Sequence, residues 1–150
     1  MKIIKDQQII EDSWLHIADD AELTAGDITV SLARWQQQAD ELINHQGNIG
    51  VRLSPADIVE DIANNLTKIS LIALEFPAFT DGRSFTQARL LRSRYHFDGE
   101  IRAIGSYMPD QVFYLSRVGV NSFQLKSTKE TETALSTLND FTVKYQASTN

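Results

Sequence analysis

Two carboxylates border the turn that follows an apolar segment of the chain. Residues 69–76 are almost entirely apolar, which is typical of a parallel strand covered on both faces, and Glu75 interrupts the segment near its end. Asp81 stands in the turn that follows, beside Gly82. Ligands of parallel sheets and barrels bind beyond the carboxyl ends of the strands, so both carboxylates are candidate catalytic bases. The alternative is that Glu75 solvates the strand end and that Asp81 only shapes the turn.

Arginine side chains form a second set of candidates, for the binding of an anion. Arg52 and Arg102 lie inside predicted strands, where a charged side chain must either be paired or face a cleft. Arg83 and Ser84 open a predicted helix, whose free backbone N–H groups favour anions. The candidate anion- or ligand-binding residues are Arg52, Arg83, Ser84, Arg102, Asp110 and Gln111. The alternative is that the two strand arginines form internal ion pairs with Glu75 or Asp110.

Several other kinds of site have no support in the sequence. The chain has no cysteine, which removes disulfides, thiolate catalysis and cysteine-ligated metal sites. His16, His45 and His96 lie in unrelated places, so no metal site is predicted, and a carboxylate-bound Mg²⁺ is the one kind left open. Neither a glycine-rich dinucleotide motif nor a Walker-type phosphate loop is present. The sequence therefore names no cofactor.

The composition is typical of one acidic globular domain. The chain has 150 residues, of which 42% are hydrophobic and 23% charged, and its net charge is −6. It has no basic run of the kind that binds phosphate backbones, so no nucleic acid is expected as a partner. The N-terminus lacks the apolar core of a signal peptide, and no segment nears the roughly 18 apolar residues of a membrane span. We therefore expect a cytoplasmic protein without membrane association.

The order of strand and helix patterns predicts the α/β class. Residues 1–26 are expected to form a short hairpin and an extension, and residues 27–146 a core of five strand–helix pairs. Strands are expected at residues 28–32, 49–53, 69–76, 100–105 and 122–125. Short spacings indicate crossover connections within a single domain, and so a mostly parallel sheet of about five strands. We favour a doubly wound, three-layer sheet over the alternative, a partial (βα) barrel, because a partial barrel would leave an open edge.

Two capping boxes mark predicted starts of helices. They pair Ser84 with Gln87 and Ser127 with Glu130. A Ser-Pro pair at residues 54–55 is expected to open a third helix.

Three longer motifs are specific enough to indicate a family. They occupy residues 72–92, 99–105 and 110–119, and shorter motifs lie at residues 12–14, 32–35 and 50–53. Together they resemble an uncharacterised bacterial family, domain-of-unknown-function family 934, over most of the chain. Members of that family are commonly encoded beside the sulfite reductase haemoprotein of assimilatory sulfate reduction, and are often labelled probable oxidoreductases for that reason. The resemblance implies a place in sulfur assimilation, but it brings no activity, cofactor or catalytic residue with it.

One departure from the family pattern limits the chemistry. Where many members carry Arg-Cys-Gly-Phe, residues 117–120 of this chain are Arg-Val-Gly-Val. A thiol at this point is therefore not essential here. Any redox role must then depend on a bound cofactor or on a partner.

Two functions from different classes follow as expectations. The first is an accessory protein of assimilatory sulfite reduction, which binds a small oxyanion or anionic metabolite, docks on sulfite reductase, or does both. The alternative is a small α/β enzyme of oxidoreductase or lyase type, in which Glu75 or Asp81 acts as general base and an arginine fixes an anionic substrate. A third option is a structural module that forms a homodimer.

Overall fold

The computed structural model describes residues 1–77, 82–107 and 109–149, and the side chains of residues 141–149 lie outside this description. The strands are β1 (Lys2–Lys5), β2 (Gln8–Glu11), β3 (Leu15–His16), β4 (Ile28–Ser31), β5 (Ile49–Leu53), β6 (Leu71–Phe76), β7 (Glu100–Gly105) and β8 (Ser122–Phe123). The α-helices are α1 (Leu32–Ile43), α2 (Arg83–Arg89), α3 (Val112–Arg117) and α4 (Thr128–Thr149). Two 3₁₀ segments, η1 (Val59–Lys68) and η3 (Pro109–Gln111), and one π-helical segment, η2 (Leu90–Arg94), complete the elements.

All of the strands belong to one sheet with the order β2-β1-β8-β7-β6-β5-β4-β3. The strands from β3 to β8 are parallel, and β1 pairs antiparallel with both β2 and β8. The class is therefore α/β, and the predicted hairpin and the five strand–helix pairs are present. The sheet is larger and more mixed than the predicted five strands, because the hairpin and β3 extend it at its two edges.

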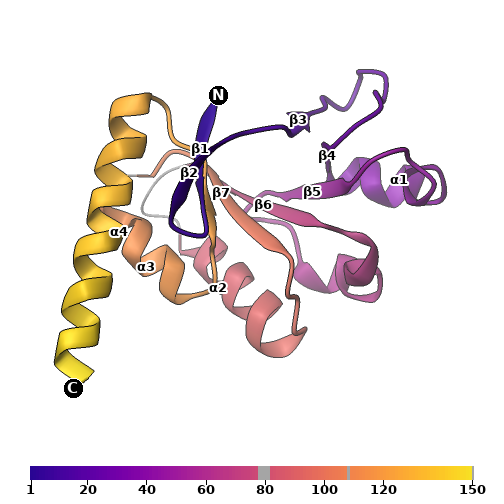
Figure 1. Cartoon of the computed structure of the whole chain (residues 1–150). Coiled ribbons are helices and arrows are strands. Elements are labelled where there is room, and N and C mark those ends of the chain that lie inside the picture. The colour runs from indigo at the N-terminus through magenta and orange to yellow at the C-terminus, as the bar shows by residue number, and fades with distance from the viewer. Residues whose placement is uncertain (78–81, 108, 150) are drawn as a thin grey trace.

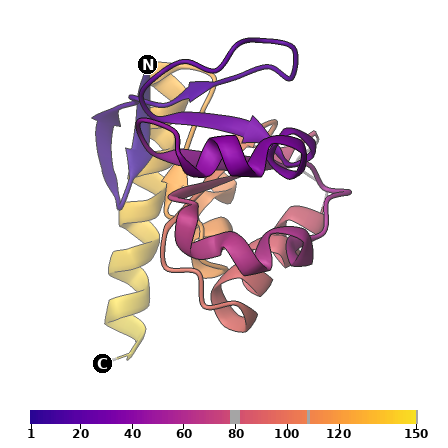
Figure 2. The same ribbon diagram turned by 90° about the vertical axis from the view of Figure 1, so that its right-hand side faces the viewer.

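The strand order contradicts the expected doubly wound sheet. Such a sheet reverses its strand order at a switch point, whereas β3 to β8 follow one another in the order of the chain. Since crossovers between parallel strands are right-handed, steps that all run in one direction keep the helices on one face. Figure 1 shows the helices arranged around the outside of the sheet, and Figure 2 shows the same arrangement from the side of α1. The alternative, a partial (βα) barrel, agrees with this order.

A short link between the two edge strands requires the sheet to be curled. β2 and β3 stand at opposite edges, yet only residues 12–14 separate them in sequence. Four Cα–Cα steps span at most about 15 Å, whereas the edges of a flat eight-stranded sheet would lie about 34 Å apart. In Figure 1 the link runs from the hairpin across to β3. The open edges that argued against a barrel are thus brought close together by the chain itself.

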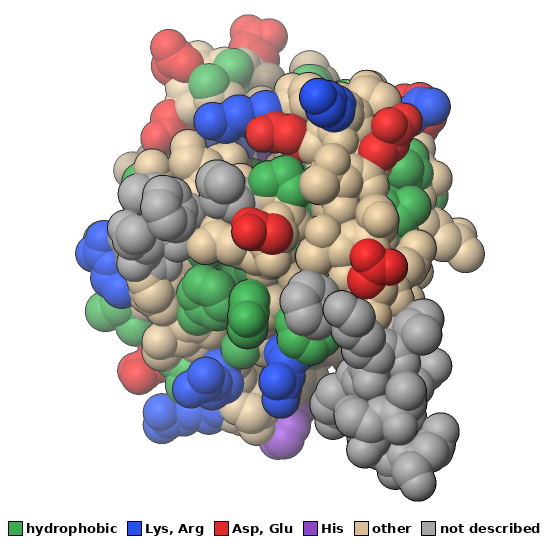
Figure 3. All heavy atoms as spheres, turned by 90° about the vertical axis from the view of Figure 1, so that its left-hand side faces the viewer, with side chains coloured by type: hydrophobic (Ala, Val, Ile, Leu, Met, Phe, Trp, Pro, Cys, Tyr) green, Lys and Arg blue, Asp and Glu red, His purple; other side chains and the backbone are tan. Residues whose placement is uncertain are grey.

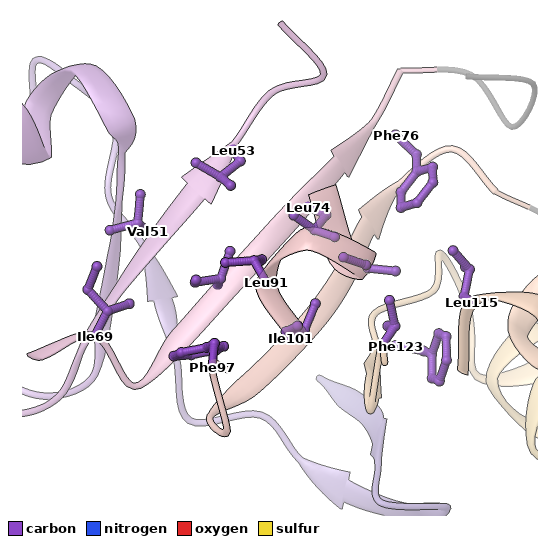
Figure 4. Close-up of a cluster of buried hydrophobic side chains, with 14 of the residues drawn as sticks. Val51, Leu53, Ile69, Leu74, Phe76, Leu91, Phe97, Ile101, Leu115 and Phe123 are labelled. Carbon is purple, nitrogen blue, oxygen red and sulfur yellow. The ribbon is translucent and has the colours of Figure 1, made fainter. Parts of the chain in front are cut away.

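The two faces of the curled sheet differ in chemistry. On the outer face, apolar strand residues such as Val51, Leu74 and Phe123 pack against Leu91 and Leu115 from the helices (Figure 4). The strand period of two sends every other side chain to the inner face. There Arg52, Ala73, Arg102 and Ser122 lie side by side in one row of the register. The apolar core lies between sheet and helices, and polar groups are gathered inside the curl.

Local predictions were met to different degrees. β5 and β7 have the predicted bounds, and the capping box of Ser127 and Glu130 is confirmed by a bond of 3.1 Å from the Glu130 amide to the Ser127 hydroxyl. The capping box of Ser84 and Gln87 is wrong. The Ser84 hydroxyl donates to the backbone carbonyl of Glu75 at 3.1 Å, because the helix begins against the end of β6. No helix among the described residues is long and apolar enough to cross a membrane.

Candidate functional site

The structure brings three of the predicted site residues to the inner face of the sheet and places the other described ones elsewhere. Arg52, Glu75 and Arg102 lie on β5, β6 and β7 with side chains on this face. Arg83 is exposed and Ser84 buried at the start of α2, while Asp110 and Gln111 belong to η3, which packs against α4. Asp81 lies outside the described residues. The predicted set is thus divided, and among its described members only the strand residues share a surface.

Arg102 takes part in an internal ion-pair network. Its side chain is 1% exposed, and its guanidinium contacts Glu100 Oε2 at 2.8 and 3.2 Å, Asp12 Oδ1 at 3.0 Å and Ser122 Oγ at 3.1 Å. Lys5 Nζ lies 3.3 Å from the other oxygen of Glu100. Two cations and two carboxylates balance within this network, as buried charges require. Arg102 is therefore internally ion-paired, as the alternative predicted, but its partners are Asp12 and Glu100 and not Glu75 or Asp110. The binding of an external anion by Arg102 stays a prediction.

Arg52 is held from one side and leaves one edge of its guanidinium unused. Nη1 donates to the carbonyl and hydroxyl oxygens of Thr29 at 2.8 and 2.9 Å, and Nη2 donates to the Ile17 carbonyl at 2.8 Å. A guanidinium has five N–H donors, so Nε–H and one Nη2–H have no acceptor among the described residues. Burial lowers the pKa of Arg52, and the charge of Glu75 partly restores it. Arginine nevertheless keeps its charge at neutral pH.

Glu75 is the partner of Arg52 and the carboxylate at the carboxyl edge of the sheet. Its Oε1 lies 3.8 Å from Arg52 Nε, which is an ion-pair distance but too long for a hydrogen bond. Its side chain is 43% exposed and borders a hollow of about 380 Å³. The walls of this hollow come mainly from apolar residues at the ends of β6 and β7, with Pro55 from the segment after β5. The internal pairing predicted for Arg52 and Glu75 is confirmed, although it is loose and solvent-accessible.

A histidine that the sequence analysis set aside completes the inner face. His16 Nδ1 lies 2.6 Å from the Thr29 hydroxyl, and Nε2 lies 3.1 Å from the Gln124 amide oxygen. Since the amide oxygen can only accept, Nε2 carries the hydrogen, and Nδ1 accepts from the hydroxyl to which Arg52 donates. Burial lowers the pKa of His16, and the charges of Arg52 and Arg102 lower it further, while its bond to Gln124 opposes the shift. His16 is therefore neutral near pH 7. It continues the series of hydrogen bonds that runs from Arg52 through Thr29 to Gln124 inside the curled sheet.

No sequence signal marked the residues that this face adds to the prediction. His16 and Asp12 belong to the link and β3, which the sequence analysis treated as an extension. Thr29 and Ser122 are polar residues next to apolar ones in their strands, as expected for inward positions. The same pattern is expected for solvent-facing residues, so it does not identify them as part of a site. Only the curl of the sheet brings these groups together.

The opposite end of the sheet carries a second hollow, of about 430 Å³. Asp27, Asn48, Ser70 and Gly99 line it, and each directly precedes a parallel strand. The amino-terminal end of a (βα) barrel usually serves stability, whereas catalysis and binding occupy the carboxyl end. Among the described residues, no group of three or more histidine or carboxylate side chains could hold a metal ion. The pair of Arg52 and Glu75 is thus the best candidate site.

Comparison with known proteins finds a family match for most of the chain. No curated protein matches the chain. The sequence model of a family described as "Bacterial protein of unknown function (DUF934)" matches residues 50–150. The match includes Arg52, Glu75 and Arg102 but not the hairpin, the link or β4. Because the match covers more than half of its residues, the chain belongs to the bacterial family DUF934.

Proposed function

We propose that the protein is an accessory binding protein of assimilatory sulfite reduction, and that it holds a small oxyanion between Arg52 and Glu75. One observation carries the proposal: the unused Nε edge of Arg52 faces a carboxylate that is too far away to accept a hydrogen bond from it. The link to sulfite reduction comes from the usual gene neighbourhood of the family that the sequence resembles.

The chemistry of the pair favours an oxyanion that still carries a proton. The Nε edge of a guanidinium donates two parallel hydrogen bonds to an oxyanion, which is the strongest mode of arginine recognition. The same oxyanion would donate its hydroxyl hydrogen to the Glu75 carboxylate. A fully ionised anion such as sulfate has no hydrogen to donate and is repelled by Glu75. Hydrogen sulfite meets both requirements, whereas sulfate meets only one.

Calorimetric titration tests this preference. The wild-type protein should bind sulfite more tightly at about pH 6 than at about pH 8. Sulfate should bind about tenfold more weakly than sulfite at about pH 6, and the difference should shrink at about pH 8, where most of the sulfite has lost its proton. Glu75→Gln removes the repelling charge, so sulfite and sulfate should then bind within about threefold of each other. Glu60→Gln, at an exposed carboxylate in the first turn of η1, is the matched control and should behave like the wild type. Absence of heat with sulfite, or an unchanged preference in Glu75→Gln, rejects the proposal.

Docking on sulfite reductase belongs to the same proposal and has its own test. The two purified proteins are titrated against each other with and without sulfite. Binding of the reductase supports the accessory role, and the absence of any heat of binding rejects the docking part of it.

The second candidate function is a small enzyme in which Glu75 acts as general base. It is favoured by the position of this half-exposed carboxylate, which borders a hollow with mainly apolar walls at the end of the sheet where (βα) enzymes carry out catalysis. Its reaction would be of oxidoreductase or lyase type on an anionic small molecule. Under this function Glu75→Gln abolishes complementation in sulfur-limited growth while circular dichroism stays unchanged. Normal growth of the variant rejects the enzyme.

A further inference from the structure

The arginines of this acidic protein are unevenly distributed. Residues 82–97 contain no Asp or Glu, although the chain as a whole has a net charge of −6. The same segment, which forms α2 and η2, contains Arg83, Arg89, Arg92 and Arg94. Arg117 adds a further positive charge from the last turn of α3. One part of the surface is therefore basic on a protein that is otherwise acidic.

The segments α2, η2 and α3 border a groove of about 550 Å³. Its walls include Arg89 and Arg117, and its apolar part includes Phe85, Tyr114 and Val118. Tyr114 is 56% exposed, so the groove presents a large aromatic surface to a partner. Figure 3 shows Lys and Arg side chains gathered along the lower edge of the face seen from the α4 side, below hydrophobic side chains. The groove thus combines cationic groups with an apolar floor.

The arginines of the groove have different tasks. Arg92 donates to the carbonyl oxygens of Gly119, Phe97 and Gly99 at 2.7 to 3.0 Å, so its guanidinium forms part of the scaffold. Arg89 and Arg117 are exposed, and neither has a carboxylate within ion-pair distance among the described residues. The Arg117 guanidinium lies 5.9 Å from the centre of the Phe113 ring, which limits its movement. Two exposed cations are therefore available to a ligand, and an aromatic ring orients one of them.

We infer that this groove docks an acidic segment of a partner protein, whose carboxylates pair with Arg89 and Arg117 while an aromatic or aliphatic side chain packs on Tyr114 and Phe85. Charge complementarity selects the occupant, because a positive patch on a negatively charged protein attracts an acidic surface and suppresses other partners. A small anion would leave the apolar floor uncovered, and a nucleic acid would be repelled by the net charge. The inference deepens the proposed docking role but does not involve the oxyanion site.

A labelled peptide provides the probe. A short fluorescein-labelled peptide of Asp, Glu, Phe and Leu residues is titrated with the protein, and binding is followed by fluorescence anisotropy. The double variant Arg89→Glu/Arg117→Glu should lose at least about tenfold in affinity, and binding to the wild type should weaken as salt rises. The matched control is Lys68→Glu/Lys126→Glu, which changes two exposed cations outside the groove by the same charge. It should change the affinity by less than about twofold.

Specific results overturn the inference. The inference fails if the acidic peptide does not bind, or if the two double variants lose the same affinity for it. It also fails if a peptide with Ser in place of Phe and Leu binds equally well, or if millimolar inorganic phosphate displaces the acidic peptide completely. Self-association of the wild type through the groove, seen by sedimentation and lost in Arg89→Glu/Arg117→Glu, would also overturn it in favour of a second copy. If that variant does not fold by circular dichroism, Arg89→Gln/Arg117→Gln replaces it. Sulfite titration of the groove variants should be unchanged, so the docking surface and the oxyanion site can fail separately.

Discussion

Removing the guanidinium of Arg102 should strongly destabilise the fold. The side chain is 1% exposed, and its two carboxylate partners, Asp12 and Glu100, are each 7% exposed. Arg102→Met keeps the apolar stem but leaves both carboxylates in the interior, with Lys5, itself 40% exposed, as the one remaining cation of the network. Removing one member of a buried ion pair typically costs about 3–5 kcal/mol. We expect a loss of this size in the free energy of unfolding, a large part of the stability of about 5–15 kcal/mol typical of a domain.

Urea unfolding followed by tryptophan fluorescence measures the loss, since Trp35 is buried in the core. Neutralising the stranded carboxylates, by adding Asp12→Asn and Glu100→Gln to Arg102→Met, should recover about half of the loss or more, because an uncharged network carries no unpaired charge. Lys129→Met, at an exposed site, is the control and should change stability by less than about 0.5 kcal/mol. A loss below about 1 kcal/mol for Arg102→Met would refute the reasoning, since it would mean that water reaches the carboxylates.

Three further predictions concern other contacts. Burial lowers the pKa of His16, so as the pH falls below the ordinary value of about 6.5 the unfolded chain takes up the proton before the folded chain does. The free energy of unfolding should therefore fall from about pH 7 to about pH 5. Urea titrations at several pH values should show that the His16→Gln variant lacks this part of the pH dependence. Gly119→Ala should cost about 1–3 kcal/mol in thermal unfolding, because φ is +106° and a Cβ would lie 2.3 Å from Arg92 Cγ, whereas Gly82→Ala, with nothing within 4 Å, should stay within about 0.5 kcal/mol of the wild type. Gln87→Leu should cost about 1–3 kcal/mol in urea unfolding, because the buried amide donates to two backbone carbonyls that would lose their donor; an unchanged midpoint would contradict this assignment.

Sequence patterns predicted the elements better than their arrangement. Strand and helix patterns are local, so they identified the hairpin and the five strand–helix pairs. The predicted helix start at Ser54-Pro55 was wrong, because the 3₁₀ segment η1 begins only at Val59. The position of Arg52 and Arg102 inside predicted strands identified them as residues that must be paired or face a cleft. The direction in which each crossover turns has no local signature, and the doubly wound order was therefore wrong. Asp12 was missed as a partner of Arg102 because it lies 90 residues away in the sequence.

The two capping boxes show how tertiary contacts override a local motif. Ser127 follows a short segment that leads into α4, and its hydroxyl is exposed and free to accept from the helix. Ser84 is buried against the end of β6, where the Glu75 carbonyl needs a donor. The Gln87 amide likewise does not bond back to the start of its helix, because it donates to two backbone carbonyls of the segment after β5. Two similar patterns, Ser-x-x-Gln and Ser-x-x-Glu, thus made different contacts, because the first is buried and its polar groups must bond to nearby backbone carbonyls.

The curl of the sheet also explains why two arginines in one register row have different partners. Ala73 stands between Arg52 and Arg102, and its small side chain leaves room for both guanidinium groups inside the curl. The link between the edge strands supplies Asp12, which neutralises Arg102. Arg52 instead meets the backbone carbonyl of Ile17 and the side chain of Thr29, neutral acceptors that orient the guanidinium without cancelling its charge. The segment that closes the sheet therefore ties Arg102 into an internal ion-pair network and leaves Arg52 beside Glu75 at the carboxyl edge of the sheet.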